Sequence, residues 1–236
     1  MTHKIERRAD GLAVLSLKRG KEESLDRFHP WVFSGALRQM PSQGEGIDEG
    51  EVVAVEAADG RPIGLGHFQI GSIAVRMLTF DATENIDETF FRNRIATAYS
   101  LRRALGLPSA QTDAFRLVHG EGDFLPGLVV DVYGSTAVVQ AHSPGMHFAR
   151  DIIASELIAL KELGVTSVYY KSETTLPYKA HLDPQNDYII GGFNGDTARE
   201  NGLSFRIDWL RGQKTGFFVD QRDNSFSNTT AATARY

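Results

Sequence analysis

The sequence predicts an α+β protein in which a small N-terminal β-barrel precedes a second unit of strands and helices. Over the first 80 residues, short apolar runs alternate with turn residues, which is typical of a closed barrel of short strands. Beyond residue 110, strands, a helical stretch and further strands follow in that order, which favours a compact α+β unit. The 236 residues, 42% of them hydrophobic, are enough to bury a core.

Four segments supply the predicted barrel strands. They cover residues 12–17, 51–56, 62–68 and 72–80, each with short runs of apolar residues. Asp59-Gly60 between the second and third is a strong signal for a hairpin turn.

One helix is predicted after the barrel. Asp87 is a suitable N-cap, and Gly106 and Pro108 end the helix. One face has apolar residues at helical spacing, namely Phe91, Ile95, Ala98, Leu101 and Leu105. The other face carries Arg92, Arg94, Arg102 and Arg103, which we interpret as solvated in preference to RNA contacts.

The second unit begins near residue 115. Strands are predicted at 128–132 and 136–141 with a turn at Gly134-Ser135, and then at 167–170, 188–190 and 203–210. A single helix is predicted over residues 144–163, with Phe148, Ile152, Leu157 and Leu160 near one face.

Composition restricts the chemistry. There is no cysteine, which excludes disulfides, thiolate metal sites and a cysteine nucleophile, and the net charge of −5 argues mildly against coating nucleic acid by bulk electrostatics. The start of the chain has no secretory signal and no long apolar run follows, so we expect a cytoplasmic protein without a membrane span.

Residues 119–123, His-Gly-Glu-Gly-Asp, could form a metal or acid-base site. Two glycines favour a sharp turn whose acids cap neighbouring amides, so we predict no metal. Residues 213–216, Gln-Lys-Thr-Gly, lack the spacing of a phosphate loop, and no catalytic centre can be assigned from the residues alone.

Basic and aromatic residues gather between residues 18 and 33. Cations can fix phosphates and flat side chains can stack on bases. Because alternate residues of a strand share a face, we interpret Trp31 and Phe33 as core. We interpret Lys18, Arg19 and Arg27 as RNA contacts; the competing interpretation is that they are solvated.

Three segments carry a family resemblance: residues 18–36, residues 115–131, and residues 213–224, which read Gln-Lys-Thr-Gly-Phe-Phe-Val-Asp-Gln-Arg-Asp-Asn. In this order and spacing they resemble the family of large-subunit ribosomal RNA methyltransferases that transfer a methyl group from S-adenosylmethionine (SAM) to cytosine C5. The first resembles the opening of the family's RNA-binding PUA domain, and the second resembles the start of its central domain.

The resemblance implies that the third segment leads into a Rossmann-like domain that holds the cofactor, followed by motifs with a catalytic cysteine. The chain shows neither a glycine-rich cofactor turn nor a cysteine. Cytosine C5 needs a thiolate to add to the ring, so we expect a truncated, inactive chain that lacks the Rossmann-like domain and binds no SAM by itself. Phe217 and Phe218 would then be exposed unless a homodimer or a covering partner buries them.

The predicted organisation is a PUA-like domain at 1–80, a linking helix at 81–110, a central α+β domain at 111–210 and a truncated entry segment at 211–236. The predicted function is binding of large-subunit ribosomal RNA. Two alternatives stay open: a methyltransferase subunit completed by a second chain, and a non-catalytic protein-interaction module. The predicted RNA contacts are Lys18, Arg19, Lys21, Arg27, His29 and Arg76. By resemblance, the residues bordering the cofactor are Lys214, Thr215, Asp220, Gln221 and Arg222.

Overall fold

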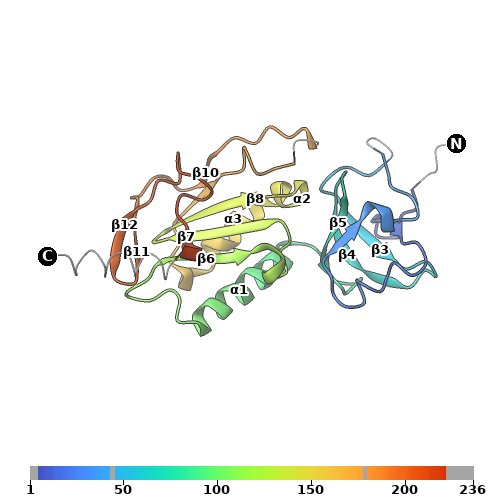
Figure 1. Ribbon diagram of the computed structural model, residues 1–236, viewed down its shortest axis with the longest axis horizontal. Coiled ribbons are helices and arrows are strands. Elements are labelled where there is room, and N and C mark those ends of the chain that lie inside the picture. The colour runs from blue at the N-terminus through green and yellow to red at the C-terminus, as the bar shows by residue number, and fades with distance from the viewer. Residues whose placement is uncertain (1–4, 43–45, 178–179, 222–236) are drawn as a thin grey trace.

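The computed structural model describes residues 5–42, 46–177 and 180–221. Figure 1 shows two units side by side, a barrel built from the first 80 residues and a larger α/β unit built from the rest.

The barrel is one five-stranded sheet with the order β1-β3-β4-β5-β2. Its edges are joined beyond β1 and β2, where the Arg38 amide donates to the Ser16 carbonyl and the Lys18 amide to the Ala36 carbonyl, both at 2.8 Å. The sheet is therefore closed, as the short strands predict. The strands are β1 (Ala13–Ser16), β2 (Trp31–Phe33), β3 (Val52–Glu56), β4 (Pro62–Phe68) and β5 (Ile73–Thr79), with the 3-10 turn η1 (Ser34–Ala36) after β2.

The α/β unit contains a second five-stranded sheet, with the order β10-β9-β8-β7-β6. Only the β8–β9 pair is parallel among these neighbours. The strands are β6 (Ala114–His119), β7 (Leu128–Tyr133), β8 (Thr136–Ala141), β9 (Ser167–Tyr170) and β10 (Asp187–Ile190). A separate hairpin, β11 (Thr197–Glu200) and β12 (Leu203–Arg206), lies at the end far from the barrel (Figure 1).

Two helices, α1 (Glu88–Ala104) and α3 (Arg150–Ala159), pack on one face of this sheet. The side chain of Asp87 caps α1 by accepting from the amides of Thr89 and Phe90, as predicted. A short helix, α2 (Pro144–Phe148), contacts β4 of the barrel. The remaining 3-10 turns are η2 (Gly120–Asp123), η3 (Lys161–Leu163) and η5 (Val219–Gln221).

The predicted helix over 144–163 is wrong in its continuity. The backbone leaves regular helix at Ala149, so that α2 faces the barrel whereas α3 packs against the sheet. The segment from β8 through α3 to β9 is thus a parallel strand–helix–strand crossover. This crossover is the unit from which Rossmann-like domains are built, whereas the sequence predicted a chain without such a domain.

The interpretation of α1 also needs correction. Leu101 and Leu105, expected on the apolar face, are exposed. Arg92 and Arg103 are exposed, as predicted, whereas Arg102 is largely buried. Arg92 donates two hydrogen bonds to Glu156, and Arg102 donates two to Asp123. These pairs fasten α1 to α3 and to η2.

Candidate nucleic-acid interface

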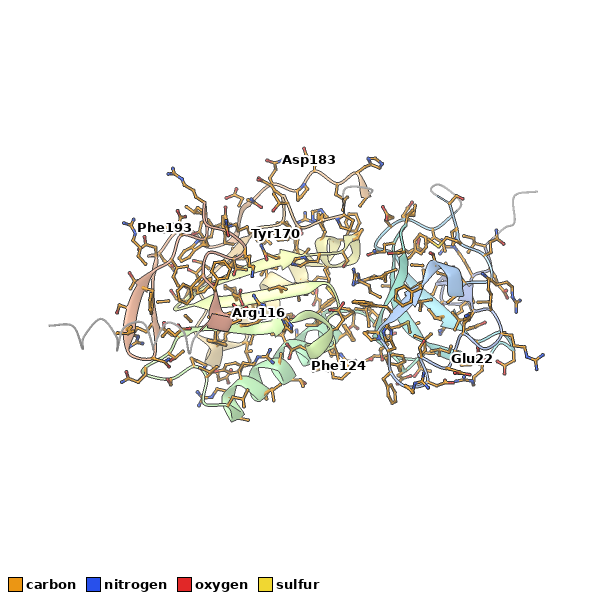
Figure 2. The ribbon with its side chains drawn as sticks, in the orientation of Figure 1. Glu22, Arg116, Phe124, Tyr170, Asp183 and Phe193 are labelled. Atoms are coloured by element: carbon orange, nitrogen blue, oxygen red, sulfur yellow. The ribbon has the colours of Figure 1, made fainter. Side chains whose placement is uncertain are left out.

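Five of the predicted RNA contacts lie on one loop of the barrel, between β1 and β2. Lys18, Arg19, Lys21, Arg27 and His29 are all exposed. Lys18 Nζ donates to the Gly35 carbonyl at 2.9 Å, which holds the base of the loop against η1. Figure 2 places Glu22 of this loop on the barrel, away from Arg116 at the centre of the α/β unit.

The charge of this loop is nearly balanced. Its four cations are interspersed with Glu22, Glu23 and Asp26. Asp26 forms an ion pair with Arg61 at 3.0 Å, so its carboxylate neutralises a cation outside the loop and leaves the loop's own cations less compensated. The loop therefore offers phosphate contacts but little long-range attraction for a polyanion.

Arg76, the sixth predicted contact, lies elsewhere. It sits on β5 opposite Trp31 and donates to Glu121 Oε1 at 3.1 Å, with 13% of its side chain exposed. Burial lowers the pKa of its guanidinium, and the charge of Glu121 opposes that shift. The structure thus engages Arg76 in the contact between the barrel and the α/β unit, apart from the other five.

Phe33 is not a core residue. It is 47% exposed, because the register of β2 against β5 shifts between Val32 and Phe33 and breaks the alternation of faces. Its ring lies near His29, with centroids 6.1 Å apart, and near Trp31 at 6.3 Å. Trp31 is half-buried, so the interpretation of both residues as core was wrong for Phe33.

A larger concave site lies on the face of the α/β sheet that the helices leave open. Its volume is about 650 Å³. Four cationic side chains line it, against a single carboxylate, that of Asp220. The lining residues that carry the argument are Arg116, Gln140, His142, Lys171, Lys214 and Phe218, with Arg211 and Asp220 also present.

Strand alternation explains how these side chains reach the open face. On β8, Val139 belongs to the core beneath the helices, whereas Val138 packs in the cluster on the opposite face. Gln140 therefore shares the open face with Val138. Lys171 follows β9, and its amide donates to the Val139 carbonyl at 2.9 Å, which places it beside β8.

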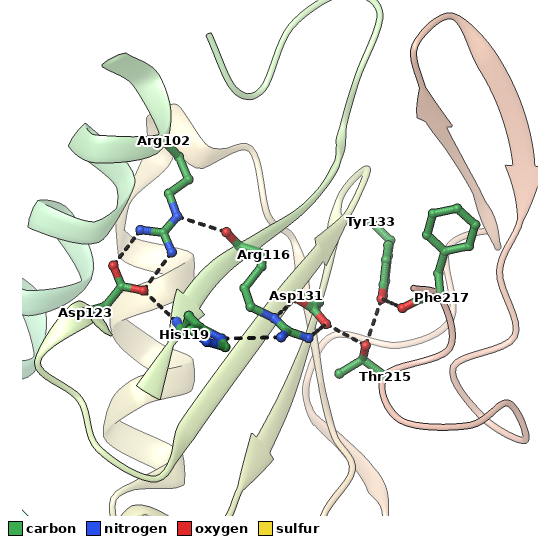
Figure 3. A network of polar contacts seen from close by, with 8 residues as sticks. All are labelled: Arg102, Arg116, His119, Asp123, Asp131, Tyr133, Thr215 and Phe217. Atoms are coloured by element: carbon green, nitrogen blue, oxygen red, sulfur yellow. Dashed lines mark hydrogen bonds and ion pairs between the residues drawn. The ribbon is translucent and has the colours of Figure 1, made fainter. Parts of the chain in front are cut away.

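The segment from Gly212 to Asp220 covers part of this face and is held there by a buried polar network (Figure 3). Thr215, fully buried, donates to Asp131 Oδ2 at 2.6 Å, and its hydroxyl lies 2.9 Å from that of Tyr133. Asp131 also accepts two hydrogen bonds from Arg116. Burial raises the pKa of Tyr133, which keeps its phenol protonated.

This anchor determines where the predicted cofactor-border residues lie. Lys214 and Asp220 line the pocket, and Thr215 is the buried anchor beneath it. Gln221 ends η5, and Arg222 lies outside the described residues.

Phe217 and Phe218 differ in exposure. Phe217 packs against Phe205, with ring centroids 5.2 Å apart, so its predicted exposure was wrong. Phe218 is 41% exposed, and Lys214 Nζ lies 4.6 Å from its ring centroid.

Residues 119–123 form a turn, as predicted. They fold into η2, where Asp123 accepts from Arg102 and from the His119 amide at 2.6 Å. Among the described residues, no cluster of His, Asp and Glu is arranged to hold a metal ion.

A smaller hollow of about 250 Å³ adjoins the larger pocket. It is lined by residues of the contact between the two units, among them Arg76, His119 and Glu121, and it shares Val129 and His142 with the larger site. The two hollows therefore meet at His142.

Sequence reasoning missed Gln140, His142 and Lys171. The one available signal was a polar residue, Gln140, near the end of the otherwise apolar run Ala-Val-Val-Gln-Ala. Nothing in the sequence shows that residues 116, 140, 171 and 214 meet, because four separate segments bring them together.

Residues 15–80 match the PUA-like domain family. The chain is 38% identical over 217 residues to the protein named ribosomal RNA large subunit methyltransferase I of Shewanella amazonensis, covering 89% of this chain and 52% of that protein. It is 36% identical over 230 residues to the protein of the same name from Alteromonas mediterranea, covering 95% and 54%. The chain thus spans about half the length of the curated relatives it matches.

Two solved structures share the fold. One, from Streptococcus mutans, is assigned to the SAM-dependent methyltransferases and superposes with a TM-score of 0.71 at 20% identity. The other is a methyltransferase solved with SAH, with a TM-score of 0.72 at 20% identity. In both cases 89% of this chain and 52% of the solved chain are covered.

These structures overturn the predicted fold class. The sequence predicted an RNA-binding unit and a central α+β domain, with the Rossmann-like methyltransferase domain absent. Over 89% of its length the chain instead follows the fold of methyltransferase chains, so that absence, and the inactivity inferred from it, are not retained.

Among the described residues, no helix is both long and apolar enough to cross a bilayer.

Proposed function

We propose that this chain recognises large-subunit ribosomal RNA as part of a SAM-dependent methyltransferase. The observation that carries the proposal is the extent of the similarity: at 38% identity it covers 89% of the chain, so it includes both the barrel and most of the α/β unit. A PUA-like barrel alone would support RNA binding without saying which reaction it serves.

The pocket on the open sheet face supports an anionic partner. Four cations and one carboxylate line it, and an exposed aromatic ring, Phe218, lies at its rim. Cations that fix phosphates beside a ring that can stack on a base are the features of sites for unpaired RNA. We assign Lys18, Arg19, Lys21, Arg27 and His29 to backbone contacts on the barrel, separate from this pocket.

The same pocket fits a cofactor only at its border. Asp220 could accept from the hydroxyl groups of a ribose, and Phe218 could stack on an adenine. The sulfonium of SAM is a cation, and the four surrounding cations disfavour it. We therefore assign Lys214, Thr215, Asp220, Gln221 and Arg222 to a border of the cofactor site, with SAM supplying the methyl group. Cytosine C5 as the methyl acceptor rests on the family resemblance. The cytoplasm as the location rests on the cysteine-free composition.

Calorimetric titration tests this proposal. We expect a stem-loop of large-subunit ribosomal RNA to bind this chain, and the triple variant Lys18→Ala, Arg19→Ala, Arg27→Ala to bind it about tenfold more weakly. The matched control removes three exposed cations of the α/β unit, Arg103→Ala, Lys161→Ala and Arg206→Ala, and should leave the affinity unchanged. Absence of RNA binding would reject the proposal. A parallel titration with SAM measures separately whether the border residues bind the cofactor.

A further inference from the structure

Gln140 is a largely buried polar residue that lines the pocket. It is 6% exposed on the open face of β8, between Val129 on the neighbouring strand and the pocket. Within the described part of the chain, its side-chain amide makes no hydrogen bond. Its amide atoms are not among the side-chain atoms that are sealed from solvent, so they are open to the pocket and available to a ligand.

His142 follows two residues later and faces the same space. It lines both the large pocket and the smaller hollow beside it, and its imidazole also has no hydrogen-bond partner among the described residues. Burial, followed by the charge of Arg76, lowers the pKa of this imidazole. His142 is therefore neutral at pH 7 and presents one donor and one acceptor, as an amide does.

Cations surround these two neutral groups. Lys171 Nζ donates to the Gly212 carbonyl at 2.5 Å, and this contact fixes the ammonium at the pocket wall. Lys214 lies over the Phe218 ring on the covering segment. Arg116 is already paired with Asp131, so Lys171, Lys214 and Arg211 are the cations most available to a ligand.

We propose that this pocket holds a single unpaired RNA nucleotide, with Gln140 and His142 hydrogen-bonding the base edge and the lysines meeting its phosphate. A neutral donor–acceptor pair recognises a base edge, whereas cations alone recognise only phosphate. A volume of about 650 Å³ accommodates one nucleotide and excludes a duplex. In paired RNA the base edges are engaged, so only a loop or a bulge can supply this ligand.

This inference rests on the proposed RNA-binding function. It adds the place where one nucleotide binds and the requirement that this nucleotide be unpaired. The test compares two RNAs of equal length, a hairpin with an unpaired loop and a full duplex, by fluorescence anisotropy. Gln140→Met keeps the length of the side chain and removes both the donor and the acceptor. The matched control, Gln39→Met, makes the same change at an exposed position of the barrel.

We expect the unmodified chain to prefer the hairpin. Gln140→Met should weaken hairpin binding about tenfold, leave duplex binding unchanged and abolish most of the preference, while Gln39→Met changes neither. Equal hairpin affinity for Gln140→Met and the unmodified chain, with the thermal midpoint preserved in both, would overturn the inference and leave RNA binding intact. Failure of both RNAs to bind would instead reject the proposed function. Displacement of the hairpin by saturating SAM would assign the pocket to the cofactor and likewise overturn the inference.

Discussion

The indole Nε1 of Trp31, in the barrel, donates a hydrogen bond of 2.8 Å to Glu121 Oε1 in the α/β unit. The same oxygen accepts from Arg76 at 3.1 Å, and the guanidinium of Arg76 lies 5.7 Å from the centroid of the Trp31 ring. One carboxylate thus joins two barrel strands to η2, and it sets the position of the barrel relative to the pocket.

Removal of this carboxylate should loosen the contact. Glu121→Ala leaves the half-buried donors of Trp31 and Arg76 without their shared acceptor, so we expect the free energy of unfolding to fall by about 2 kcal/mol. Urea denaturation measures this change. Glu23→Ala, at an exposed position of the barrel loop, is the control and should change the free energy by less than about 0.5 kcal/mol. Equal stability of the two variants would show that the contact is incidental.

Gly145 in α2 tests the packing of the same interface. A Cβ at this position would overlap the His67 ring on β4, so Gly145→Ala must push the two units apart. We expect a loss of about 2–3 kcal/mol, in the range of overpacked cores, although alanine favours helix. Gly192→Ala is the matched control, since a Cβ there meets nothing within 4 Å. A thermal midpoint for Gly145→Ala equal to that of the control would contradict the observed packing.

His67 should make the fold sensitive to acid. Burial lowers the pKa of its imidazole from 6.5 to about 4, and its buried Nδ1 has no partner among the described residues. The unfolded chain then takes up the proton first as the pH falls, so stability is complete above about pH 6.5 and declines between about pH 6.5 and about pH 4. The slope approaches 1.4 kcal/mol per pH unit and totals about 3 kcal/mol.

His67→Gln should remove this component, since glutamine does not titrate. Urea unfolding at about pH 7 and about pH 4.5 measures the difference for the unmodified chain, His67→Gln and the exposed control His181→Gln. An equal loss of unfolding free energy on acidification in all three proteins would show that His67 is not the source of the acid sensitivity.

Thr215 should control the docking of the covering segment. Thr215→Val keeps the shape and removes the hydroxyl that joins Asp131 to Tyr133, so we expect a cost of about 1–3 kcal/mol. The segment that carries Lys214 should then open more often, and trypsin should cleave after Lys214 faster. Thr197→Val, at an exposed position of β11, is the control. An unchanged cleavage rate would mean that other contacts hold the segment.

Local signals predicted the local structure well. The Asp87 cap and the Asp59-Gly60 turn are present, and β4 occupies the predicted residues 62–68, because capping and turn geometry depend on neighbouring residues. Phe33 was misassigned because a register shift in β2 is set by its partner strand. The break at Ala149 was missed because no glycine or proline stands at that position to signal it. The two helices separate there because α2 contacts the barrel.

The candidate site was only half predictable. The basic loop of the barrel is contiguous in sequence, and so its cations could be proposed from spacing alone. The pocket could not, because Arg116, Gln140, Lys171 and Lys214 meet only after β6, β8, β9 and the covering segment have packed. The paired state of Arg76 depends on Glu121, which is 45 residues away along the chain.

The salt dependence of RNA binding tests the central claim most directly. Affinity for an unpaired loop of large-subunit ribosomal RNA is measured by anisotropy between about 50 and about 200 mM salt. If the barrel loop and the pocket contact phosphates through about six cations, the logarithm of the affinity should fall against the logarithm of salt with a slope of about −4. Undetectable binding at the low-salt end, or binding that does not change with salt, would contradict the assignment of this chain to RNA recognition.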